Sequence, residues 1–264
     1  MDYDINILKR GKNSHNLFCL LGTDLFNELA NNIRLDINIY GIYVHEHIDE
    51  KWTTIETVDI DTKKTLNSYV DRYTAIIKDI QRKSAYYICG YSFGGYIAME
   101  VARSLENAGE NIGMIAMIDT IYRNPNSQLS FNRKMCAHIE MLKRYGYRYI
   151  VEKLSTKIKQ KKAPFHSNES HNSNITYYRM LARHKISTNY APSYNGPVHL
   201  FRAMIRDPFN PTSYMSGLGW DDHIPNLFVH KVPGDHSTML KTPNVNAIAS
   251  ILENLLNEKN IISP

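Results

Sequence analysis

Hydrophobic residues in the first 120 positions fall into short runs that alternate with amphipathic stretches. Apolar runs at residues 17–21, 37–42, 85–89 and 112–118 are bounded by turn or polar residues, which is typical of buried strands. Residues 5–10 alternate weakly and predict an edge strand. Strands that alternate with helices predict an α/β fold, with a mostly parallel sheet and helices on both faces. The helices are expected at 25–33, 65–81 and 96–108.

This alternation stops near residue 120 and resumes near residue 198. Residues 121–190 are polar, basic and helix-like, with the best helical pattern at 135–154 and a loop at 167–174. We predict a single domain over residues 1–264, with the helical insertion at 121–190 forming a lid at the rim of the active site. The remaining expected elements are strands at 198–203 and 226–232 and a closing helix at 244–257.

The motif at residues 90–95 carries the clearest chemical signal. It reads G-x-S-x-G directly after the strand at 85–89 and before an amphipathic helix, which is the context of a nucleophile elbow. Small neighbours are needed there because the serine sits in a strained turn where strand and helix backbones pass closely. A serine that only caps a helix does not need glycines on both sides. We therefore predict that Ser92 is a nucleophile.

A serine hydroxyl needs an adjacent base that is itself oriented by an acid. His236 follows the last predicted strand and a Pro-Gly turn, which places its imidazole at the rim of the sheet and makes it the candidate base. Asp119 ends the strand at 112–118, and Asp207 follows the strand at 198–203. The residue pattern leaves both aspartates open as the acid.

An oxyanion hole requires two backbone N–H groups near the nucleophile. The first candidate donor is Phe93, directly after the serine, and the second is Thr23, in the turn that follows the strand at 17–21.

Composition is that of an ordinary globular protein, with 43% hydrophobic and 22% charged residues. The chain has no run of eighteen apolar residues and no secretory signal, so we expect a cytoplasmic protein without a membrane segment. Cys19, Cys89 and Cys136 have no metal-binding spacing, and the first two fall in predicted buried strands as small hydrophobes. We expect no metal and no bound cofactor.

Charge is distributed unevenly along the chain. Residues 123–190 hold 14 lysines and arginines but three acidic residues, a net charge of +11, whereas the rest of the chain has −6. A basic segment of this kind is either a solvated surface or a docking surface for an acidic partner. Tyrosines lie among these basic residues, but without a recognisable nucleic-acid-binding module we expect no nucleic acid.

Six segments of the chain together match the motifs of one known family: residues 17–20, 90–95, 98–102, 117–120, 218–220 and 232–236. In these segments the chain resembles the thioesterase domains that terminate nonribosomal peptide, polyketide and animal fatty acid synthases, members of the α/β-hydrolase superfamily. The resemblance implies that Asp119 is the triad acid, whereas stand-alone editing thioesterases take theirs from the later strand, where Asp207 lies. It implies a structural role for Trp220. The oxyanion turn at 21–25 departs from the family in lacking proline and in having a single glycine.

This resemblance implies a thioesterase that acts on a chain tethered to the phosphopantetheine arm of an acyl or peptidyl carrier protein. Ser92 forms an acyl-enzyme, which water or an internal nucleophile releases as an acid or a ring. The basic segment at 123–190 would then face the carrier, since carrier proteins are typically acidic. The alternatives are an editing thioesterase, a generic carboxylesterase and a non-catalytic interaction module.

Overall fold

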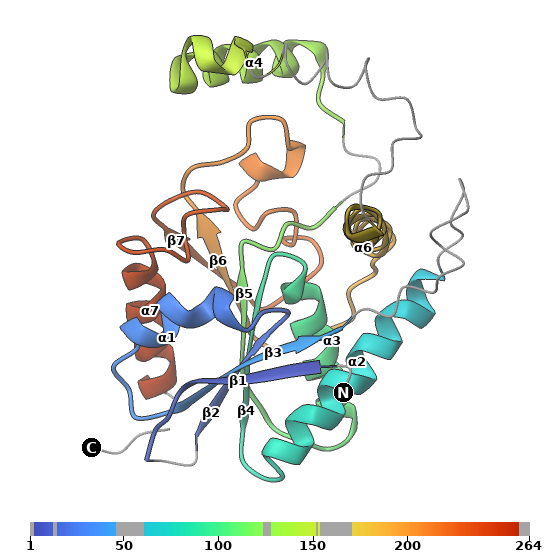
Figure 1. Cartoon of the computed structure of the whole chain (residues 1–264), viewed down its shortest axis with the longest axis vertical. Helices are drawn as coiled ribbons and strands as arrows, with labels where there is room; N and C mark the ends of the chain where they lie inside the picture. Colours follow the sequence, from blue (N-terminus) through green and yellow to red (C-terminus); the bar gives the residue numbers. More distant parts are fainter. Residues whose placement is uncertain are drawn as a thin grey trace.

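The computed structural model describes residues 3–12, 15–45, 61–123, 128–151, 153 and 171–258, and these form a three-layer α/β arrangement (Figure 1). The central sheet has seven strands in the order β1-β3-β2-β4-β5-β6-β7. The first strand pairs antiparallel with β3 at one edge, and every other pair is parallel. The strands are β1 (Tyr3–Lys9), β2 (Asn16–Leu20), β3 (Asn38–Val44), β4 (Tyr86–Tyr91), β5 (Ile112–Ile118), β6 (Val198–Ala203) and β7 (Leu227–Val232).

Helices cover both faces of the sheet. Both faces must be covered because β2 has apolar side chains on each of them. Phe18 and Leu20 join the core on one face, whereas Leu17 and Cys19 join the core on the other. The first face is covered by α2 (Thr62–Ile80) and α3 (Gly94–Asn107), and the second by α1 (Asn27–Asn32) and α7 (Val245–Glu258). The predicted fold class, a mostly parallel sheet with helices on both faces, is therefore confirmed.

The helices of the basic segment differ from the prediction at two places. Helix α4 (Phe131–Tyr145) ends at Gly146, whose φ of +59° interrupts the helix expected at 135–154. Helix α6 (His171–Thr188) begins inside the loop expected at 167–174, so that prediction is wrong at 171–174, while 167–170 lie outside the described residues. Asparagine and serine favour loops by propensity, but burial of Ala182 and Ile186 farther along α6 stabilises the helix.

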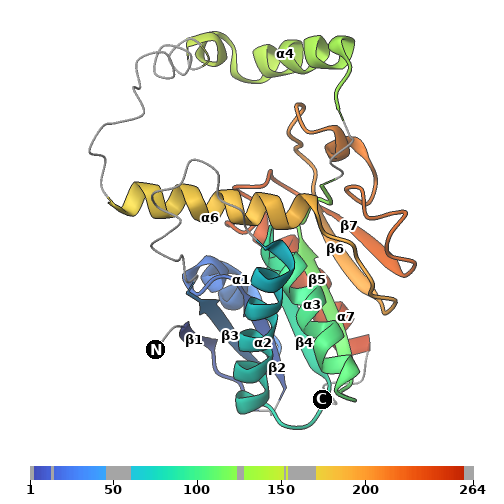
Figure 2. The same ribbon diagram turned by 90° about the vertical axis from the view of Figure 1, so that its right-hand side faces the viewer.

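Helices α4 and α6 lie beyond the carboxyl ends of the parallel strands (Figure 2). Helix α6 crosses above α2 and α3, and its Ile186 belongs to the core cluster on that face. Helix α4 lies farther out and contacts the segment after β6: Arg144 Nη1 donates to the Arg206 carbonyl at 3.1 Å, and Tyr214 donates to Glu140 at 3.1 Å. These contacts hold α4 above the loops that follow β5 and β6. The lid boundaries at 121–190 remain a prediction.

Two of the three cysteines lie side by side in the sheet. Cys19 of β2 is in register with Cys89 of β4, both side chains are fully buried, and both thiols are free. Burial raises the pKa of the Cys19 thiol well above its usual value. Cys136 is an exposed free thiol on α4. Within the described ranges, no helix has the length and apolar character required to cross a membrane.

Candidate active site

Ser92 occupies a sharp turn between β4 and α3. Its φ of +54° lies in the left-handed region, which non-glycine residues seldom adopt. The Ser92 N–H donates to the Ile118 carbonyl at 2.8 Å, and the Thr120 hydroxyl donates to the Ser92 carbonyl at 2.9 Å. The end of β5 therefore holds the strained residue from both sides.

Glycines make this turn possible because strand and helix approach too closely for a side chain. A Cβ at Gly90 would lie 2.1 Å from the Gly94 carbonyl oxygen, and a Cβ at Gly95 would lie 2.0 Å from the Thr120 hydroxyl. Larger residues at either position would force the backbones apart. The geometry supplies the physical reason for the G-x-S-x-G-G pattern.

Asp119 and His236 come together at the rim of the sheet. His236 Nδ1 lies 2.8 Å from Asp119 Oδ2, in hydrogen-bonding geometry. Asp119 follows β5 with its N–H bonded to the Phe201 carbonyl at 2.8 Å, and its side chain is 1% exposed. Burial by itself raises the pKa of Asp119, but the hydrogen bond with His236 and the charge of Arg206 outweigh it and hold that pKa below its usual value.

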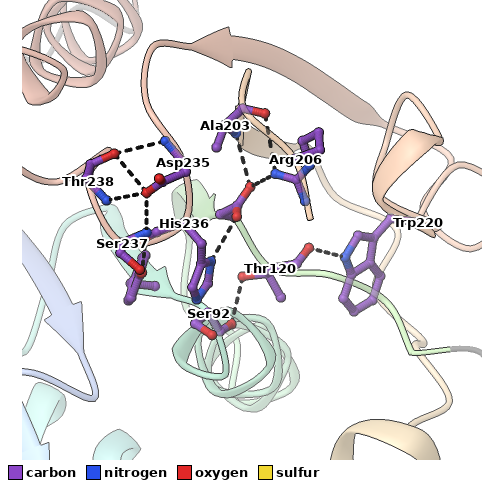
Figure 3. A network of polar contacts seen from close by, with 11 residues as sticks. Ser92, Thr120, Ala203, Arg206, Trp220, Asp235, His236, Ser237 and Thr238 are labelled. Atoms are coloured by element: carbon purple, nitrogen blue, oxygen red, sulfur yellow. Dashed lines mark hydrogen bonds and ion pairs between the residues drawn. The ribbon is translucent and has the colours of Figure 1, made fainter. Parts of the chain in front are cut away.

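Ser92 and the imidazole of His236 line the same pocket. His236 is 46% exposed and lies close to Ser92 in Figure 3. Among the described residues, no hydrogen bond yet joins the serine hydroxyl to this imidazole. Catalytic contacts of this kind are often long without substrate and tighten when it binds.

Tyr91, the residue before the candidate nucleophile, contacts the candidate base directly. Its ring stacks on the His236 imidazole with centroids 4.8 Å apart and planes 24° apart, and its hydroxyl donates to the His236 carbonyl. Burial is the main cause that raises the pKa of Tyr91 to about 12, so the hydroxyl stays protonated and able to donate. Tyr91 was not among the residues predicted for the site, although its place in the elbow could have suggested it.

Asp207, the alternative acid, does not reach the histidine. Its side chain is exposed, and Oδ1 accepts from the Phe209 N–H at 2.9 Å. The neighbouring Arg206 turns inward instead and donates from Nη1 to Asp119 Oδ1. The structure thus brings Asp119 to His236, and a cation rather than a second acid comes from the end of β6. No local sequence pattern predicts that Arg206 is buried.

The two candidate oxyanion donors lie in different places. Phe93 adopts helical angles, with φ of −60° and ψ of −28°, and lines the pocket beside Ser92. Thr23 precedes a short 3₁₀ helix, η1 (Asp24–Phe26), and its carbonyl packs near Gly41 of β3. Among the described residues, the pocket lining includes Phe93 but not Thr23.

The pocket has a volume of about 630 Å³ and lies between the sheet rim and the helices of the insertion. Met141 and Tyr145 of α4 and Met180, Arg183 and His184 of α6 contribute to its lining. Phe93, on the floor, has the Arg183 guanidinium 5.8 Å from its ring centroid. Ser92 therefore faces a cavity with both apolar and cationic walls.

Trp220 supports the site from behind. The side chain is fully buried, and its indole Nε1 donates to the Thr120 carbonyl at 2.8 Å, next to Asp119 in the chain. It also packs on Tyr96 and Tyr122. Such burial agrees with the structural role expected for it. In the part of the chain that the structure describes, no three His, Cys, Asp or Glu side chains cluster as a metal site would require.

Comparison with known proteins identifies relatives of this chain. The family model described as "Thioesterase domain" matches residues 22–256. Vanchrobactin synthetase VabF of Vibrio anguillarum is 25% identical over 210 residues, which cover 75% of this chain and 7% of VabF. Malpinin synthetase of Mortierella alpina is 30% identical over 95 residues, which cover 36% of this chain and 1% of that protein. The chain therefore spans only a small fraction of the length of these relatives.

Solved structures show the same fold. A four-domain nonribosomal peptide synthetase bound to AMP and glycine matches with a TM-score of 0.64 and 21% identity, covering 95% of this chain and 20% of that one. The NocB thioesterase domain, in a covalent complex with a fluorophosphonate nocardicin G analogue, matches with a TM-score of 0.62 and 18% identity, covering 96% and 99%. The sheet order, the elbow and these matches together show the α/β-hydrolase fold of thioesterase domains.

Proposed function

Because this chain belongs to the thioesterase domain family, we propose that it releases an acyl or peptidyl chain from the phosphopantetheine thioester of a carrier protein, through an acyl-enzyme on Ser92. The observation that carries the proposal is the 2.8 Å hydrogen bond between His236 and Asp119, beside a serine held at φ +54°. The synthetase relatives favour a carrier-bound chain as the substrate.

In the first half-reaction, His236 takes the proton of the Ser92 hydroxyl as its oxygen attacks the thioester carbonyl carbon. Asp119 fixes the imidazole through Nδ1, so that Nε2 faces the serine, and stabilises the imidazolium that forms. The carbon–sulfur bond then breaks, and His236 returns the proton to the departing phosphopantetheine thiolate. An ester on Ser92 and a free thiol on the carrier result.

In the second half-reaction, water or an internal amine or hydroxyl of the chain attacks the ester carbonyl. His236 removes a proton from this nucleophile and gives it to Ser92 as the ester bond breaks. Water yields a free acid, and an internal nucleophile yields a ring. The residues of the triad supply base and nucleophile, and the phosphopantetheine belongs to the carrier, so the proposal needs no metal or cofactor bound to this chain.

The negative charge on the carbonyl oxygen requires donors at the elbow. Phe93, at the N-terminus of α3, offers its backbone N–H together with the positive end of the helix dipole. We assign the second donor to the turn after β2, where Thr23 is the candidate and would have to approach when substrate binds.

A carrier is the partner that the charge of the insertion favours. Lys134 and Lys143 are exposed on α4, within the segment of net charge +11. An acidic carrier approaching this surface would be steered toward the pocket by long-range attraction.

The experiment that tests this function compares three substrates that carry the same acyl group. The purified protein is given an acyl-carrier thioester, an acyl-N-acetylcysteamine thioester and the corresponding ethyl ester, with Ser92→Ala as the control. We expect thiol release that requires Ser92, with kcat/KM highest for the carrier thioester. Preference for the simple ester would favour a generic carboxylesterase, and no turnover from folded protein would favour a non-catalytic module.

A further inference from the structure

Asp119 uses only one of its carboxylate oxygens to contact His236. The other, Oδ1, accepts from the Ala203 N–H at 3.0 Å and from Arg206 Nη1 (Figure 3). The arginine side chain is 8% exposed and the aspartate 1%, so this is a buried ion pair. The ion pair lies beside His236, and Asp119 and Arg206 both line the pocket that contains Ser92.

We propose that Arg206 is a positioning residue of the thioesterase site, whose guanidinium orients the Asp119 carboxylate toward His236 and offsets part of the negative charge that the imidazole experiences. The kinetic consequences of this inference rest on the proposed function. The arrangement of Arg206, Asp119 and His236 can be tested without turnover.

The backbone around Arg206 is fixed from two sides. On one side, the segment after β6 bonds to the loop of the base: the Ile205 N–H donates to the Gly234 carbonyl at 2.9 Å, two residues before His236. On the other, Arg144 of α4 donates to the Arg206 carbonyl at 3.1 Å. The guanidinium is therefore held in register with both His236 and Asp119, as a positioning residue requires.

A purely structural explanation fits this arginine poorly. Burying a guanidinium is costly unless a carboxylate and further hydrogen bonds compensate, and an apolar residue of similar volume is often at least as stable. Arg206 Nε is buried without a hydrogen-bond partner, and the only carboxylate with which Arg206 forms an ion pair among the described residues is Asp119. Besides Asp119, the guanidinium donates to the Ala203 carbonyl at 3.3 Å, so in the described structure its charge is paired with the candidate acid alone.

Other charged or titratable groups also surround the Asp119–His236 pair, so the effect of Arg206 on the protonation of His236 must be separated from theirs. Tyr91 stacks on the imidazole, and the Asp235 carboxylate is occupied by the N–H groups of Ser237 and Thr238. Arg202 of β6 lies nearby but donates to the Ser213 carbonyl at 3.1 Å instead of to Asp119. The same pocket is also lined by Arg123, Arg144, Arg183, His184 and Asp207.

Removing the positive charge of Arg206 changes two properties of the site. Asp119 loses one of the donors that orient it, which lowers the rate. The imidazolium of His236 then experiences the undiminished charge of the carboxylate and keeps its proton to higher pH. A base that stays protonated cannot activate the serine, so the acidic limb of the pH–rate profile moves upward.

The test is the pH profile of kcat/KM for Arg206→Met, Arg206→Lys and the matched control Arg202→Met, measured with an acyl-N-acetylcysteamine thioester. For Arg206→Met we expect a loss of roughly tenfold to a hundredfold near pH 7. We also expect its acidic limb to shift upward by about half a unit to one unit. Arg206→Lys keeps the positive charge, so its acidic limb should stay close to that of the wild type. The acidic limb of the control Arg202→Met should also stay close to that of the wild type.

A second readout does not depend on turnover. In the Ser92→Ala background, NMR titration of the His236 imidazole should show the same upward shift when Arg206→Met is added. An unchanged titration in folded protein, or an equal shift from Arg202→Met, would overturn the proposal. If Arg206→Met does not fold, Arg206→Gln keeps a donor without the charge and gives the same readout. If the His236 titration shifts as expected but the wild-type protein has no thioesterase activity, the proposed function is contradicted and the positioning role of Arg206 stands.

Discussion

Tyr91 lies flat against the imidazole of His236, with ring centroids 4.8 Å apart, and its hydroxyl binds the backbone carbonyl of the same histidine. The residue before the candidate nucleophile therefore contacts the loop that carries the candidate base, although 145 positions separate the two in the chain. Elbow and base loop form one rigid unit through this contact, and the relative placement of Ser92 and His236 depends on it.

Tyr91→Phe keeps the stacked ring and removes only the hydroxyl, whereas Tyr91→Ala removes both. We expect a loss in kcat of a few-fold for the phenylalanine variant and of about a hundredfold for the alanine variant, because the imidazole loses its support. Steady-state kinetics on an acyl-N-acetylcysteamine thioester measure both. Equal activity of Tyr91→Ala and wild type would show that the stacking does not position the base.

Asp119→Asn and Asp207→Asn separate the two acids that the sequence left open. Asp119 contacts His236 directly, so the amide should lower kcat by about 10³- to 10⁴-fold, as expected when the triad acid no longer fixes the tautomer. Asp207→Asn removes an exposed carboxylate that caps Phe209 and should change kcat by less than about threefold. The reverse order of effects would transfer the role of the acid to Asp207.

The depressed pKa of Asp119 also predicts a dependence of stability on pH. A carboxylate whose pKa is lower in the folded protein stabilises it above the ordinary carboxyl pKa, and this contribution is lost as the pH falls through the folded-state value. The free energy of unfolding of the wild type should therefore fall more steeply than that of Asp119→Asn between about pH 5 and pH 2. Urea unfolding at several pH values measures both slopes, and parallel slopes would show that Asp119 titrates normally.

The elbow glycine Gly90 should not tolerate a methyl group. Its Cβ would meet the Gly94 carbonyl at 2.1 Å, and backbone atoms cannot move aside without breaking the turn. We expect Gly90→Ala to destabilise the fold by roughly 3 kcal/mol or more. Gly109→Ala is the matched control: nothing lies within 4 Å of its Cβ, and only the positive φ of +82° costs about 1–2 kcal/mol. Thermal unfolding that ranks the two variants the other way would contradict the packing described for the elbow.

The basic surface of α4 predicts a salt dependence that differs between substrates. For an acidic carrier, kcat/KM should fall with rising ionic strength, whereas for the small N-acetylcysteamine thioester it should stay nearly constant. The double variant Lys134→Glu and Lys143→Glu should lower kcat/KM for the carrier about tenfold and leave the small substrate unaffected. Equal salt dependence for both substrates would remove the case for carrier steering by this surface.

The sequence predicted those parts of the site that depend on local pattern. A Pro-Gly turn after the last strand pointed to His236, and glycine spacing pointed to Ser92, because each feature is encoded within a few residues. The same local pattern left Asp119 and Asp207 both open as the acid, and only the family resemblance favoured Asp119. The inward turn of Arg206 and the stacking of Tyr91 depend on contacts across more than 80 positions, which periodicity does not report. Gly146 ends α4 because of its own φ, whereas α6 extends through residues 171–174, which local propensity assigned to a loop.

The central claim is that Ser92 carries the acyl chain during turnover. Intact-protein mass spectrometry after rapid mixing with an acyl-N-acetylcysteamine thioester tests it directly, followed by proteolysis to map the adduct. We expect a mass increase of one acyl group on the peptide that contains Ser92, and no adduct on Ser92→Ala. An adduct on another residue, or thiol release from Ser92→Ala at the wild-type rate, would contradict it.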